Sequence, residues 1–214
     1  MTTELQVRVN QDAPRAAGEE ALIDLKGTKR GEACVIDFYT AMALEQNCFQ
    51  VRAGSVTTPL VGDVVITTLA AEMTADAALG LTMIPTYFNI GIRLYAATLL
   101  ELGLKSVGAV STAGTAFVPL PVYMGGKAAQ TTGRVAAAGG CTISNDVVTT
   151  TRVIYQAANA IAAGAFTTTF TYKARLPHVL VGPACLYVVA AADTTGPSYY
   201  AAFEYIELSS SVIG

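Results

Sequence analysis

The chain is predicted to fold as an antiparallel β-sandwich, and three observations support this. Apolar residues recur with a period of two along many short segments, which is typical of strands with one buried face. These segments are rich in Val, Thr, Ile and Tyr and end at Gly, Pro or Asp, as strands and their turns require. There is no heptad and no alternation of strands with helices. About eight to ten strands can be counted, which favours an all-β sandwich of the jelly-roll type with at most one or two short helices.

The composition favours packing and assembly over catalysis. Of 214 residues, 52% are hydrophobic and 14% are charged, whereas an ordinary soluble domain has about 25% charged residues. A chain with so few charges must cover much of its surface, and other copies of itself are the economical cover. The net charge of −3 and the scattered Lys and Arg residues argue against direct nucleic-acid binding.

Residues 1–31 are predicted to be an N-terminal arm, and residues 32–214 a single domain. The arm has most of the charge density, and its first residues lack the basic and apolar regions of a secretory signal. Two short apolar segments within it have the alternation or composition of strands. They supply six candidate assembly residues: Leu5, Val7, Val9, Leu22, Ile23 and Leu25.

The first part of the domain is predicted to be β with one helix. Cys34, Ile36, Phe38, Met42 and Leu44 share one parity, and Phe49–Ala53 alternates until Gly54. A further strand is expected at Val64–Leu69. The segment Ala70–Leu79 is the best helix candidate because only Thr74 in it is β-branched, and Gly80 would end that helix.

The middle of the chain contains one clear strand and two ambiguous segments. Phe88, Ile90, Ile92 and Leu94 alternate with polar or small residues, which predicts a strand. Ala96–Leu104 fits a helix or a strand equally well. Phe117–Met124 contains two prolines, so an edge strand or a loop is expected. Ser106–Gly126 is uncharged, but its glycines, prolines and hydroxyl residues favour turn-rich β structure, and no transmembrane segment is expected.

The last third has the strongest strand signals. Val147–Gln156 is rich in β-branched residues, and apolar and polar residues alternate from Phe166 to Leu176. Two further strands are predicted at Val179–Ala192 and Ser198–Leu208, separated by a turn at Asp193–Pro197.

No catalytic, cofactor-binding or metal-binding residues are predicted. His178 is the single histidine, there is no G-x-S-x-G elbow, and the four cysteines form no C-x-x-C pair. Buried reduced thiols are expected instead. Glu72 and Asp76 fall on one face of the predicted helix and are interpreted as solvated. Glu204 and Glu207 fall on opposite faces of the last strand, so neither pair predicts a glycosidase site.

Two closing segments carry a resemblance to a known class of protein. Ala184–Ala192, a turn and then Tyr199–Leu208 resemble the last strands of viral jelly-roll capsid proteins. In those proteins the final strand often ends in an aromatic, acidic and apolar run before a short tail. The arm, the many small residues and the low charge are similar too. Many such capsid proteins have a strongly basic arm for the genome, whereas this arm is mixed in charge.

The resemblance implies a self-assembling capsid subunit, found in the virion and made in the host cytoplasm. Its partners would be other copies of itself and other virion proteins, and the genome would be held by a membrane or a separate protein. The apolar arm residues would add a strand to a neighbour's sheet. The alternative is a trimeric receptor-binding head or a tumour-necrosis-factor-like module, with Tyr199, Tyr200, Phe203 and Tyr205 lining a threefold axis.

Overall fold

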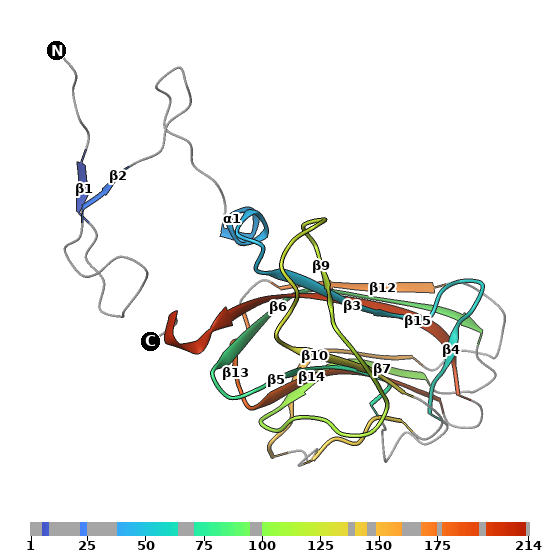
Figure 1. The fold of residues 1–214 in the computed structure, drawn as a ribbon. Coiled ribbons are helices and arrows are strands. Elements are labelled where there is room, and N and C mark those ends of the chain that lie inside the picture. Colours follow the sequence, from blue (N-terminus) through green and yellow to red (C-terminus); the bar gives the residue numbers. More distant parts are fainter. Residues whose placement is uncertain are drawn as a thin grey trace.

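The chain folds into two antiparallel sheets packed face to face (Figure 1). The computed structural model describes residues 6–8, 22–24, 38–63, 71–94, 100–136, 140–144, 149–159, 168–174, 177–192 and 196–212. Within these ranges the only helices are α1 (Phe38–Leu44) and a single 3₁₀ turn, η1 (Ser210–Val212). The predicted antiparallel β-sandwich with few helices is therefore confirmed.

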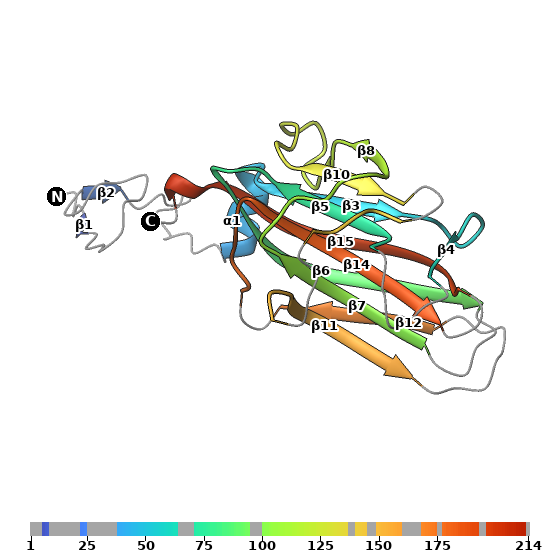
Figure 2. The ribbon, with the colours of Figure 1, turned by 90° about the horizontal axis from the view of Figure 1, so that it is seen from below.

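Each sheet is organised around one of the two C-terminal strands. The β14 sheet has the spatial order β11 (Arg152–Asn159), β7 (Leu100–Val107), β14 (Ala184–Ala192), β5 (Met73–Ala77), β10 (Thr132–Val135), β8 (Thr115–Phe117) (Figure 2). The β15 sheet has the order β12 (Thr168–Lys173), β6 (Leu81–Leu94), β15 (Ser198–Ser209), β3 (Cys48–Ala53), β9 (Leu120–Pro121). Two short strands lie outside this order: β13 (Leu180–Val181) pairs with β6, and β4 (Leu60–Val61) pairs with β15.

The eight longest strands of the sandwich pair in a nested pattern. Strand β3 pairs with β15, β5 with β14, β6 with β12, and β7 with β11. The first of these strands along the chain thus pairs with the last, the second with the seventh, and so on inward. Strands β6 and β15 also pair, as do β7 and β14, which completes the two sheets. Most connections therefore cross from one sheet to the other.

The main core lies between the sheets, and its residues follow the strand period. Tyr199, Ala201, Phe203 and Tyr205 of β15 all point into it. Strand β14 differs because all nine of its residues are buried. Its even-numbered residues face the main core, whereas Cys185, Tyr187 and Val189 face a second apolar cluster on the other side. The outer face of the β14 sheet is thus covered by the protein's own loops.

The strongest strand predictions are confirmed. Phe49–Ala53 lies in β3, the alternation from Phe88 lies in β6, and the two closing strands are β14 and β15. The ambiguous segment before Leu104 ends in a strand, β7. The proline-containing segment contributes to β8 and β9, which form the ends of their sheets as expected for edges. Val64–Leu69 lies outside the described residues.

Two predictions of local structure are wrong. The helix expected at Ala70–Leu79 is replaced by β5, and Gly80 lies in the turn that follows, with a φ of +90°. Glu72, Thr74 and Asp76 alternate with apolar residues, and this period of two prevails over the helix propensity of alanine. Conversely, Phe38–Leu44, assigned to β structure from its parity, forms α1.

We expect Gly62→Ala to destabilise the fold by about 2 kcal/mol or more. A Cβ at Gly62 would overlap the Ala190 carbonyl oxygen, and Asp63 N donates to that oxygen at 2.9 Å, so the backbone cannot withdraw. Denaturant unfolding followed by circular dichroism measures the change. Gly108→Ala is the matched control, since a Cβ there meets nothing within 4 Å. Equal stability of the two variants would contradict this account.

Candidate functional site

Helix α1 is the most unusual surface feature of the sandwich. Its sequence, FYTAMAL, is almost entirely apolar or aromatic, yet none of its residues is buried. Phe38, Tyr39 and Leu44 are 52%, 42% and 57% exposed. The helix ends where Gln46 adopts a φ of +62°, a left-handed conformation typical of helix C-termini. A helix of seven residues is too short to be stable alone in water, so its apolar face requires packing that a single copy supplies only in part.

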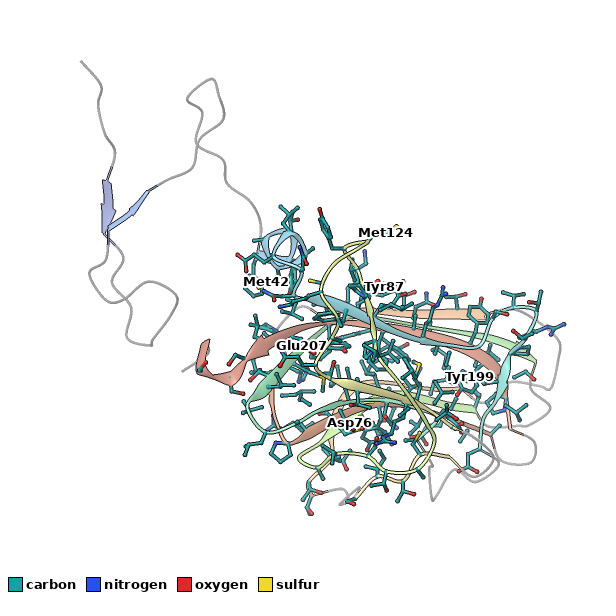
Figure 3. All side chains as sticks on the ribbon, in the orientation of Figure 1. Met42, Asp76, Tyr87, Met124, Tyr199 and Glu207 are labelled. Carbon is teal, nitrogen blue, oxygen red and sulfur yellow. The ribbon has the colours of Figure 1, made fainter. Side chains whose placement is uncertain are left out.

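The loop after β9 lies beside α1 and exposes further apolar side chains. Val122 and Tyr123 are about half exposed, and Met124 is 93% exposed. Figure 3 shows Met124 at the tip of this loop, pointing away from the sheets. The loop is fixed to the chain just after α1, because Lys127 N donates to Gln46 Oε1 at 2.9 Å and Lys127 Nζ donates to Asn47 Oδ1 at 2.6 Å.

We call the exposed apolar side chains of α1 and of the loop after β9 the α1–β9 surface. Its members are Phe38, Tyr39, Leu44, Val122, Tyr123 and Met124. A groove of about 660 Å³ runs beneath it, between Tyr39 and Val122 on one side and the outer face of the β15 sheet on the other. On the sheet side, the groove is lined by Tyr87, Lys173 and Glu204. These residues add a few polar groups to a groove that is otherwise mainly apolar.

The two sheets also present open strand edges. The outer edges of β11 and β12, eight and six residues long, pair with no other strand in the described ranges. Open edges of this length are templates for strand addition by another chain. At the opposite ends of the sheets, β8 and β9 are only three and two residues long.

The predicted arm contains a small β-ribbon. Strand β1 (Gln6–Arg8) pairs antiparallel with β2 (Leu22–Asp24), so that Val7 lies opposite Ile23 and Leu22 opposite Arg8. These three apolar residues are thus brought together on one ribbon. The other candidate arm residues, Leu5, Val9 and Leu25, lie outside the described residues.

Buried carboxylates attach the covering loops to the β14 sheet. Asp76 accepts hydrogen bonds from Ser111 N at 2.8 Å and Ser111 Oγ at 2.7 Å, and its other contact is Arg134 Nε at 3.3 Å. Asp76 and Glu72 are 6% and 5% exposed, so their interpretation as a solvated face is wrong. The alternation of Glu72, Thr74 and Asp76 with apolar residues was a signal in the sequence that could have identified them as one face of a strand.

Glu207 has a similar role on the last strand. Its carboxylate accepts hydrogen bonds from Gln130 N at 3.0 Å and Thr131 N at 2.8 Å. Glu204 lies on the other face and accepts from Gln50 Nε2 at 3.1 Å, so the predicted opposite orientation of the two glutamates is confirmed. Each of the two carboxylates thus accepts hydrogen bonds from another part of the chain.

Glu72 is a buried carboxylate with a strongly shifted protonation equilibrium. Burial raises its pKa from 4.5 to about 7, and the nearby Asp63 carboxylate adds to the rise. The folded protein therefore retains a proton on Glu72 at pH values where the unfolded chain has released it.

The described cysteines and the histidine are not arranged for catalysis. Cys48, Cys141 and Cys185 are free thiols, and burial, followed by nearby carboxylates, raises the pKa of each. They are therefore protonated and poorly nucleophilic at neutral pH. His178 is half-buried before β13. No group of three or more His, Cys, Asp or Glu side chains able to hold a metal ion is found in the described ranges.

The comparisons with known proteins identify no relative. No protein-family model matches the chain, and neither a curated protein nor a solved structure is detectably similar to it. In the described part of the chain, neither helix has the length and apolar character needed to cross a bilayer. Of the four aromatic residues expected to line a threefold axis in the trimeric alternative, Tyr199, Phe203 and Tyr205 are buried in the core of the subunit and Tyr200 is partly buried.

We expect Glu72→Gln to make stability less dependent on pH. As pH rises from about 4.5 to about 7, the wild-type protein loses up to about 3 kcal/mol of unfolding free energy, because the unfolded state binds fewer protons there. The neutral amide removes this loss, so the variant should be the more stable protein at pH 8 and similar to wild type below pH ~4.5. Thermal unfolding across this pH range measures it. The exposed Glu45→Gln is the control, and a less stable Glu72→Gln at pH 8 would contradict the assignment.

Proposed function

We propose that the protein is a self-assembling shell subunit of a virion, built on a single jelly roll. The observation that carries the proposal is the α1–β9 surface, an apolar helix and loop that the folded chain leaves exposed. The proposed location is the capsid shell, and the proposed partners are further copies of the chain together with other virion proteins.

The nested strand pairing supports the jelly-roll assignment. A jelly roll is a double-sheet fold of eight strands arranged as two Greek keys. Folding one long hairpin over itself pairs the first strand with the last and the second with the seventh, which is the pattern formed by β3, β15, β5 and β14. Of the shorter strands, β8, β9 and β10 lie in the insertion between β7 and β11, β4 lies between β3 and β5, and β13 lies between β12 and β14.

A second copy of this chain is the occupant that best fits the α1–β9 surface. Exposed apolar areas of this kind mark interaction sites, and the low charge of the whole chain leaves few groups to keep copies apart. In a closed symmetric shell each subunit repeats the same contact, so a modest interface is multiplied. The sandwich has a complete core of its own, so assembly is expected to join folded subunits.

The arm provides a second contact in this proposal. Its apolar residues, among them Val7 and Ile23, would add strand pairing to a neighbouring subunit, and the open edges of β11 and β12 are suitable acceptors. The arm is mixed in charge, so we propose that the genome is held by other components and that this chain makes no direct nucleic-acid contact.

We expect Leu44→Glu combined with Met124→Glu to prevent assembly without unfolding the subunit. Both side chains are exposed in the single copy, so the substitutions cost little in the monomer but place two charges in the proposed contact. Sedimentation velocity and negative-stain electron microscopy of wild type and variant measure the outcome.

Leu79→Glu is the matched control, because Leu79 is 83% exposed in the turn before β6 and lies outside the α1–β9 surface. Closed particles or flat arrays that disappear only in the double variant support the proposal. Uniform monomers of the wild-type protein at all concentrations would overturn it, and discrete three-lobed objects would favour the trimeric head instead.

We also expect deletion of residues 2–31 to leave a folded domain that assembles poorly. The strands of both main sheets lie outside the deleted segment, so the circular dichroism spectrum and the unfolding midpoint should change little. Particle yield by electron microscopy measures the effect on assembly. Particles formed at the wild-type yield by the shortened chain would exclude a role for the arm.

A further inference from the structure

A cavity unrelated to the α1–β9 surface opens at one end of the sandwich. It has a volume of about 420 Å³ and lies where β7 ends beside the start of β11, with β13 and the first residue of β14 on its other side. Figure 2 shows β7 and β11 as neighbours in the β14 sheet. Cavities of this size are sufficient for small organic ligands.

Ser106 contributes a buried hydroxyl to this cavity that has no use in the fold. It follows Leu100, Leu102 and Leu104 on the core-facing side of β7 and is 1% exposed. Its Oγ has no hydrogen-bond partner within the described chain. An unpaired buried hydroxyl is unfavourable, and Ser106 is one of the residues that line the cavity.

Arg152 lies beside Ser106 in the β14 sheet and is exposed to solvent. It pairs directly with Ser106 in the β11–β7 register, and directly opposed residues of an antiparallel pair lie on the same face of the sheet. Arg152 also lines the cavity. Its guanidinium makes no ion pair with the described residues, and none of the described residues that line the cavity is acidic.

The other walls of the cavity are mainly aliphatic. Apart from Gly108 and the polar Thr150, the remaining lining residues are Val107, Val179, Leu180, Val181 and Ala184. A guanidinium and a hydroxyl from residues that line the same cavity are suited to a carboxylate, which can accept from both. Aliphatic walls disfavour a fully hydrated dianion such as phosphate, since its remaining oxygens would lose water without gaining partners.

We infer that this cavity binds a small monocarboxylate with a short aliphatic chain. Arg152 and the Ser106 hydroxyl hold the carboxylate, and the chain lies against Leu180, Val181 and Ala184. The inference is independent of the proposed assembly, because the cavity contains no residue of the α1–β9 surface.

The test is isothermal titration calorimetry of the full-length protein with hexanoate, with 1-hexanol and inorganic phosphate as comparison probes. We expect saturable binding of hexanoate at one site, with a Kd on the order of 1 mM. Ser106→Ala and Arg152→Gln should each weaken it at least about tenfold. Arg52→Gln is the control, since Arg52 is exposed on the outer face of the other sheet and carries the same change of charge.

The outcomes separate a built site from a passive cavity. Unchanged hexanoate affinity in Arg52→Gln, together with weak binding of 1-hexanol and phosphate, supports the inference. Absence of saturable hexanoate binding, or equal affinity in all four proteins, overturns it. Equally tight 1-hexanol, or equally tight phosphate, also overturns it, because the carboxylate and the aliphatic chain must both contribute. The melting temperature of Ser106→Ala should be unchanged or higher, since the hydroxyl has no partner to lose; a lower value would show that Ser106 is needed for packing.

Discussion

The burial of β14 on both faces is the constraint on which the rest of the structure depends. One face completes the core between the sheets, and the other must be covered because Cys185, Tyr187 and Val189 are apolar. The insertion between β7 and β11 supplies that cover. Asp76 attaches this insertion through Ser111 and Arg134. The polar contacts of Asp76 therefore keep the insertion over the apolar cluster of Cys185, Tyr187 and Val189. Loss of these contacts would expose the cluster, and loss of the cluster would expose Asp76 to water.

This arrangement leaves the two sides of the sandwich unequal. The outer face of the β14 sheet is finished by the protein's own loops, whereas the β15 sheet carries α1 and the loop after β9 with their apolar side chains exposed. The long insertion between β7 and β11 thus contributes to both sheets, because it covers the β14 sheet and also adds β9 and the exposed loop after it to the β15 sheet. A shell subunit needs one such unequal surface, because contacts must form in defined directions, and this asymmetry accords with the assembly that we propose.

Local pattern predicted the strands of the sandwich but not its surface. The second half of β6, from Phe88, and most of β15 were evident because apolar residues on the buried face alternate with polar or small residues on the other. Strand β5 was mistaken for a helix since alanine favours helices and the burial of Glu72 and Asp76 depends on residues far away in the sequence. The helical state of Phe38–Leu44 and the cavity beside Ser106 also depend on distant segments: Gln46 contacts Lys127, and Ser106 meets Arg152 only through strand pairing. A single sequence contains no signal that predicts such contacts between distant residues.

The nested pairing also determines when, during synthesis, the subunit can complete its fold. Strand β3, which follows α1 directly, hydrogen-bonds to β15 at the far end of the chain, so its sheet remains incomplete until the last strand has left the ribosome. Such long-range pairing folds slowly and late. A prematurely terminated chain would lack β15, so the sheet beside α1 would be incomplete. Such truncated chains would therefore be excluded from any assembly that forms through α1.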